Sequence, residues 1–180
     1  MPTRPTFAEL FVSELRTEGE ISRRFIARVP EDKLLWKPHE KSHTAGMLAN
    51  HVALLPGQIS AAAMVERFPI DDVAAVSFVQ PESVAQILAT LDAGLAEAEA
   101  RLSGMSDDDY ARTWHATVGG EPIMTVPRHV VLRTILFNHT CHHRGQLGVY
   151  LRLLGVAVPW SYGPSADEAP PIVALQEAGA

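Results

Sequence analysis

Apolar residues recur at helical spacing in four stretches of the chain. These stretches span residues 6–29, about 44–67, about 81–102 and about 127–154. In the first, Phe7, Phe11 and Leu15 fall on one face, with charged residues between them. Pro81 and Pro127 stand at the predicted starts of the third and fourth stretches, and proline is favoured in the first turn of a helix. The pattern therefore predicts an all-α fold of four amphipathic helices, arranged as a four-helix bundle.

Long connectors separate the predicted helices. Residues 30–42 have room for a short helical turn, and residues 103–127 lose the helical spacing. Two β-prone runs on either side of Gly119–Gly120 predict a short β-hairpin before the last helix. We expect one domain over residues 1–168, followed by a flexible C-terminal tail over residues 169–180.

The composition narrows the classes of partner. The chain has 180 residues, of which 47% are hydrophobic and 20% charged, as is usual for one soluble domain. A net charge of −6 gives no general basic surface, so we expect no nucleic-acid partner. No apolar run reaches the roughly 18 residues of a membrane span, and the N-terminus has no signal-peptide pattern. With Cys141 as the single cysteine, these features predict a cytoplasmic protein without a membrane partner.

Histidines interrupt two apolar stripes. In the last predicted helix, one face carries, at steps of three or four, Leu132, Leu136, His139, His143, Leu147, Tyr150 and Leu154. In the second, His51 stands between Leu48 and Leu55 at the same spacing. Three imidazoles would thus face one core, where each unsatisfied polar group costs about 1–3 kcal/mol.

A shared metal ion would satisfy these three imidazoles. Histidines four residues apart on a helix project side by side and can bind one ion, and His51 would complete the set from the facing helix. Three protein ligands leave one coordination position of the ion open, which is more typical of catalytic metal sites than of structural ones. The alternative is that the three histidines bind carbonyl groups or one another. We favour His51, His139 and His143 as metal ligands; the sequence identifies no catalytic residue.

The other histidines and the cysteine are expected outside this cluster. Helical geometry places His142 at the rim of the site or in solvent, and it points Cys141 away from His139 as a packing residue. The remaining candidates are interpreted as surface histidines: His39, His43, His115 and His129. Thr140 stands where a zinc metalloprotease of the HExxH type carries its glutamate base, which argues against protease activity.

Several polar and aromatic residues keep two interpretations. Arg144 would bind an anionic substrate group or pair with an acidic residue on the bundle surface. Gln146 would orient a metal ligand or merely pack. The tryptophans in the connectors would line the mouth of a pocket or pack: Trp36, Trp114 and Trp160.

Two segments resemble a known family. The stretch FNHTCHHRGQLGVYLRLLGVAVPWSYGPSADE closely resembles the C-terminal signature of the DinB/YfiT-like superfamily. The upstream WKPHEKSHTAGMLANH resembles the family's Trp-x-Pro segment that leads to the histidine of the second helix. Together with the order of helices and connectors, the resemblance covers roughly residues 7 to 168.

The resemblance implies a fold, a metal and a class of reaction. It implies a four-helix bundle that holds one divalent metal ion, nickel or zinc, through His51, His139 and His143. Members are often homodimers and are not known for binding DNA. Characterised relatives include S-transferases that use a low-molecular-weight thiol as cosubstrate, and a thiol-dependent isomerase.

Three functions remain open on the sequence. The first is a metal-dependent thiol S-transferase that acts on a small-molecule substrate. The second is a metal-assisted hydrolase, which needs a carboxylate base, for which Glu18 of the first helix is the candidate. The third is a non-catalytic, stress-related protein in which the ion only satisfies the buried imidazoles.

Overall fold

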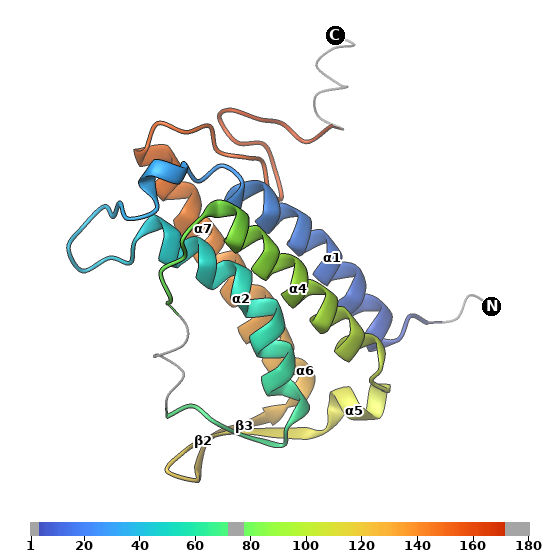
Figure 1. The fold of residues 1–180 in the computed structure, drawn as a ribbon. Helices are drawn as coiled ribbons and strands as arrows, with labels where there is room; N and C mark the ends of the chain where they lie inside the picture. Colours follow the sequence, from blue (N-terminus) through green and yellow to red (C-terminus); the bar gives the residue numbers. More distant parts are fainter. Residues whose placement is uncertain (1–3, 72–77, 172–180) are drawn as a thin grey trace.

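The computed structural model describes residues 4–71 and 78–171. The four long helices of this part form a bundle (Figure 1). The last of them consists of three contiguous segments. In chain order the elements are α1 (Phe7–Ile26), η1 (Glu31–Lys33), α2 (Ala45–Met64), β1 (Arg67–Pro69), α4 (Val84–Ser103), α5 (Asp107–Ala111), β2 (Thr113–Val118), β3 (Glu121–Pro127), α6 (Arg128–Val131), η2 (Leu132–Asn138) and α7 (His139–Leu153). The predicted four-helix bundle is confirmed.

Each long helix packs against two main neighbours. The helix α4 packs against α1 and α2, and α7 likewise contacts both α1 and α2. Consequently α7 turns one side towards α2 and another towards α1. Leucines from several helices fill the centre of the bundle, and Leu91, Leu147 and Leu151 are fully buried there. The helices α2 and α4 approach closely at Gly94 of α4, where a Cβ atom would lie 3.2 Å from the backbone nitrogen of Gly57 in α2.

Local capping fixes where the helices begin. In α1, the Thr6 side chain accepts a hydrogen bond from the Glu9 backbone N–H, and the Glu9 carboxylate accepts one from the Thr6 N–H. The third long helix begins at Val84 and not near Pro81, because the Ser83 side chain accepts from the Gln86 N–H and so caps the helix there.

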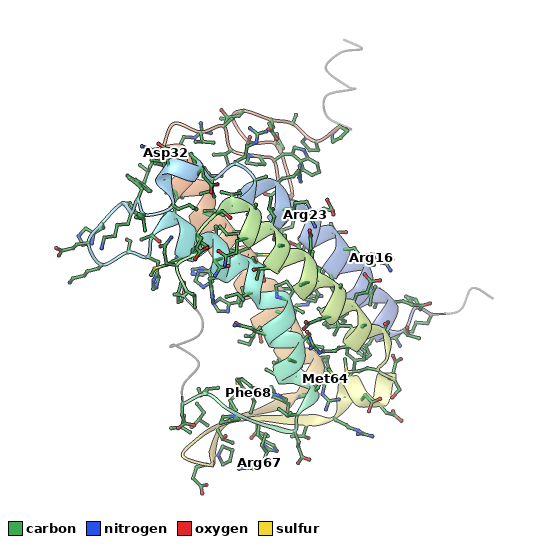
Figure 2. All side chains as sticks on the ribbon, viewed as in Figure 1. Arg16, Arg23, Asp32, Met64, Arg67 and Phe68 are labelled. Carbon is green, nitrogen blue, oxygen red and sulfur yellow. The ribbon has the colours of Figure 1, made fainter. Side chains whose placement is uncertain are left out.

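A small sheet crosses one end of the bundle (Figure 1). The predicted hairpin is confirmed as β2 and β3, and its turn uses Gly119 and Gly120 at φ of 56° and 85°, which only glycine adopts without strain. The sequence did not predict β1, since the second helix was expected to reach residue 67. This helix ends at Met64, and Arg67 and Phe68 enter a strand parallel to β2 (Figure 2).

The last helix is not a single regular α-helix, as had been expected. The segments α6, η2 and α7 follow one another without a break, and η2 is a π-helix. At its end, the backbone N–H of His139 donates to the carbonyl of Thr134, five residues earlier. This wider turn lies directly before the first histidine of the last helix. Single π-helical turns within α-helices are frequent at functional sites.

Ion pairs and the C-terminal segment close the bundle. Arg16 and Arg23 lie along α1 (Figure 2), where they pair with Glu99 and Asp92 of α4. The segment after α7 runs across the end of the bundle opposite the sheet (Figure 1), and Arg152 pairs there with Asp167 at 2.5 Å. Most of the tail that was expected to be flexible, residues 169–180, lies outside the described residues. In the described part of the chain, no helix is both long and apolar enough to cross a membrane.

Candidate metal centre

Three histidines from two helices meet inside the bundle, between α2 and α7. His51 of α2 is buried, and His139 and His143 of α7 are half-buried. The ring centroids of His51 lie 5.4 Å and 4.6 Å from those of His139 and His143, which are themselves 4.5 Å apart. Each ring offers one nitrogen atom to the cluster, and these atoms all lie within 4.8 Å of one another. The structure thus brings together the three histidines that the sequence pattern singled out.

The contact between the two histidines of α7 is close. Their Nε2 atoms are 2.6 Å apart, and Nδ1 of His143 lies 2.8 Å from Oε1 of Gln146. Because an amide oxygen can only accept, Nδ1 of His143 carries the proton and donates it, and Nε2 presents its lone pair to the cluster. The short Nε2–Nε2 contact fits a proton shared by the two rings. Gln146 therefore orients His143, as one of its two interpretations predicted.

The surroundings keep these imidazoles neutral. Burial lowers the pKa of His143 to about 4, which outweighs the opposing effect of the hydrogen bond to Gln146. Burial also lowers the pKa of His139, and the nearby His142 lowers it further. At neutral pH both rings therefore keep the lone pair that binding a metal ion requires.

Phe78 covers the cluster from outside the helices, a role that sequence reasoning missed. Its ring stacks on His51, with centroids 4.2 Å apart, and on His43, with centroids 3.7 Å apart. The Asn50 side chain of α2 donates to the carbonyl of Val79 at 3.1 Å, and so holds this segment beside the site. Phe78 stands in the connector before α4, where no periodic pattern marks a residue as functional.

An open hollow adjoins the cluster on the side of Gln146. It has a volume of about 330 Å³ and is lined by residues of the connector before α2, of α2 and of α7, among them Ser42, His43, Gln146 and Tyr150. His43 is exposed, as expected of a surface histidine, but it borders the site through its stack on Phe78. His142 is also exposed, with its ring centroid 4.8 Å from that of His143, which agrees with the predicted position at the rim.

Arg144 lies on the other side of α7, away from the cluster. It is 2% exposed, and its Nη2 atom lies 2.6 Å from Oε2 of Glu18 in α1. The hydroxyl of Tyr162 donates to the same carboxylate oxygen at 2.9 Å, and Sγ of Cys141 lies 2.6 Å from that hydroxyl. Of the two interpretations of Arg144, pairing with an acidic residue is the one observed, although in the core and not on the surface.

The remaining candidates serve packing or hydrogen bonding elsewhere. Trp114 is buried and donates its N–H to the carbonyl of Ala62 at 2.9 Å, whereas Trp36 packs edge-on against Tyr150 and Trp160 lies under the guanidinium of Arg24. His115 and His129 are half-buried and so less exposed than the other two histidines expected at the surface, His39 and His43. Nδ1 of His129 lies 3.1 Å from the carbonyl of Tyr110, at the end of the bundle that carries the sheet.

The donor set fits a transition-metal ion. Neutral imidazole nitrogens are the ligands that zinc, nickel, copper and iron share, and three of them from two helices leave room for a further ligand. Metal–nitrogen bonds of about 2.0–2.1 Å require small rotations of the rings from the separations given above. The three histidines could therefore hold a metal ion.

Fold and site together define a helix-bundle protein with three converging histidines. The sequence profile of the DinB family matches residues 1–174, and the chain belongs to this family. The fold is similar to that of a DinB-like protein from Bacillus cereus, with a TM-score of 0.67, 21% identity, and coverage of 84% of this chain and 95% of that one.

A second solved structure gives the same picture. It is a DinB-like protein from Bacillus subtilis, YjoA, with a TM-score of 0.65, 16% identity, and coverage of 84% of this chain and 96% of that one. The comparison with curated proteins gave no match. At these levels of identity the two structures support the fold alone.

Proposed function

We propose that this protein binds one divalent metal ion through His51, His139 and His143 and transfers a low-molecular-weight thiol to a small-molecule acceptor. The observation that carries the proposal is the convergence of three imidazole nitrogens within 4.8 Å in a half-buried site. Family membership supports it, because thiol S-transferases occur among the characterised relatives. Nickel and zinc are the ions that we expect.

Each part of the site has a place in this function. A bound divalent ion would lower the pKa of a thiol that coordinates it, so that the thiolate forms at neutral pH. Gln146 holds the His143 ring through Nδ1 and so fixes which nitrogen faces the site. Phe78 shields the His51 side of the cluster, while the hollow beside Gln146 gives a small molecule access from solvent.

The second candidate, metal-assisted hydrolysis, needs a carboxylate base at the site. Glu18 was the candidate from the sequence, but its carboxylate binds Arg144 and Tyr162 on the α1 side of the last helix. The carboxylate faces these partners and not the histidine cluster, and the arrangement therefore counts against Glu18 in this role. We propose the transferase ahead of the hydrolase for this reason.

We also propose that the protein is cytoplasmic and forms a homodimer.

The first test is the metal content of untagged protein. Elemental analysis should find about one equivalent of nickel or zinc in the wild type and a strong loss in His143→Ala. His39→Ala is the matched control, since His39 is exposed in the connector before α2 and should leave the metal content intact. A wild type that takes up neither ion, even after soaking, would contradict the proposal.

The second test separates the enzyme from a non-catalytic metal protein. In a cobalt-substituted form, a low-molecular-weight thiol should change the visible spectrum, because sulfur replaces a weaker ligand at the metal. If the ion only satisfies the buried imidazoles, its removal should lower the melting temperature. A saturating thiol should then leave the cobalt spectrum unchanged.

A further inference from the structure

A second cavity lies between the small sheet and the bundle. Its volume is about 310 Å³, and its lining includes Ile59 and Ala62 of α2, Trp114 and Ala116 of β2, Val131 of α6 and Ile135 of η2. All the residues that line it are apolar in character, and the indole N–H of Trp114 is already engaged by the carbonyl of Ala62. The cavity therefore suits a hydrocarbon group and not a polar one.

The cavity is lined in part by the same two helices, α2 and the last helix, that carry the three histidines. Along the last helix, His143, His139, Ile135 and Val131 follow one another at steps of four residues, and the last two line the cavity. Along α2, His51 is followed on the same face by Ile59 and Ala62. Ile135 lies only four residues before His139 on the same continuous last helix.

Residues on the chain between β1 and α4 reach both places. Ile70, just after β1, lines the cavity, and Phe78 stacks on His51. The opposite side of the histidine cluster has the hollow with Ser42, His43 and Gln146 in its lining. The histidine site thus has an open hollow with some polar lining on one side and a wholly apolar cavity on the other.

We propose that the acceptor substrate of the histidine site carries an apolar group that lies in this cavity. The proposal rests on the proposed function, because it places the reacting end of the substrate at the histidines. A cavity of about 150 Å³ holds benzene, so the volume here suits a group about the size of a bicyclic hydrocarbon. A stable interface between two proteins takes about 20–30 residues from each partner, many more than line this cavity.

The cavity can be tested without any metal. Naphthalene should bind metal-free protein saturably, with about one equivalent, and should change the fluorescence of Trp114. In Ala116→Phe the added ring should fill the cavity and abolish binding, and Met124→Phe, at the half-buried rim, serves as a second blocking variant. Ala93→Phe is the matched control on the exposed side of α4. Absence of saturable binding to the wild type would overturn the proposal. Binding that is lost at higher protein concentration, because a second copy of the chain associates and covers the cavity, would overturn it as well.

The link to the histidines needs a molecule that reaches both places. In cobalt-substituted protein, 3-phenylpropane-1-thiol should bind far more tightly than ethanethiol, because each buried methylene raises affinity roughly fourfold. The ratio of the two affinities should fall towards one in Ala116→Phe and stay high in Ala93→Phe. A ratio near one in the wild type, with both thiols bound, would overturn this inference and leave the proposed function intact. If no thiol perturbs the cobalt, the proposed function fails, and the naphthalene titration still decides whether the cavity binds an apolar group.

Discussion

The two sides of α7 bury polar groups in different ways. On the side of α1, Arg144 and Glu18 form an ion pair at 2.6 Å, and Tyr162 adds a hydrogen bond to it. On the side of α2, His139 and His143 meet His51, and their burial keeps them neutral. His143 and Arg144 are neighbours in the sequence, but a rotation of about 100° per residue turns them to different partners.

This difference indicates which side is structural and which is chemical. The ion pair contains both charges that it needs, so the chain itself balances the cost of burial. The three imidazoles, in contrast, bring nitrogen atoms close together without an opposite charge among them. A metal cation is the partner that binds several imidazole nitrogens at once. We therefore expect substitutions on the α1 side to change the stability of the fold, and substitutions on the α2 side to change the affinity for metal.

The largest expected effect is on the α1 side. Arg144→Met leaves the carboxylate of Glu18 buried without its countercharge, which should lower the free energy of unfolding by about 3–5 kcal/mol. Urea denaturation of metal-free protein measures this loss. The double variant Glu18→Leu/Arg144→Met should regain much of it, because two apolar groups leave no charge uncompensated.

Arg133 offers a matched control for this comparison. It pairs with Glu14, again between the last helix and α1, but both side chains are partly exposed. Arg133→Met should therefore cost less than about 1 kcal/mol. Equal losses in Arg133→Met and Arg144→Met would contradict the distinction between a surface ion pair and a buried one.

A smaller effect is expected from Gln146, and on metal affinity. Gln146→Leu removes the acceptor for Nδ1 of His143, so this ring is no longer held with its Nε2 towards the cluster. Metal affinity should fall by about 10- to 100-fold, as competition with a chromogenic chelator would show. The free energy of unfolding without metal should change little, since Gln146 is exposed.

Gln146→Glu is the informative control. A carboxylate still accepts the hydrogen bond from Nδ1 and should preserve or increase the affinity for metal. Weak binding in Gln146→Glu, equal to that in Gln146→Leu, would mean that the contact with His143 does not orient the ligand.

Periodic patterns explain why so much of the fold could be predicted. Four apolar stripes gave the four long helices, because burying one face is what fixes helices in a bundle. The strand β1 was missed since three residues carry no detectable alternation, and its pairing with β2 bridges parts of the chain far apart in sequence. The π-helical turn before His139 was missed because it depends on packing and leaves no spacing of its own in the sequence.

The histidine cluster was predictable for the same reason, whereas its surroundings were not. His51, His139 and His143 interrupt apolar stripes, so their side chains had to face the core. Phe78 lies outside every stripe, and only the folded chain shows that it stacks on His51. The partner of Arg144 also needed the structure, because Glu18 and Tyr162 come from opposite ends of the chain.

The smallest expected effect again concerns the α1 side. Tyr162→Phe removes a hydroxyl that contacts Glu18, Arg144 and Cys141, and the free energy of unfolding should fall by about 1 kcal/mol. Tyr162 is 67% exposed as a whole, but the burial of its hydroxyl end and the hydrogen bond to Cys141 raise its pKa above the ordinary value of 10.0. A raised pKa means that the folded state favours the neutral phenol. The contribution of this phenol to the free energy of unfolding is therefore complete below pH 10. It is lost as the pH rises further, because the phenol of the unfolded chain then ionises.

The difference in stability between wild type and Tyr162→Phe should therefore stay constant between pH 7 and about 9.5 and shrink above pH 10. Urea denaturation of both proteins across this range measures it, and metal affinity serves as the second readout. Because Tyr162 belongs to the network on the α1 side, Tyr162→Phe should bind metal as tightly as the wild type. A loss of metal affinity in this variant would show that the two sides of α7 are coupled, and the division between a structural and a chemical side would then be wrong.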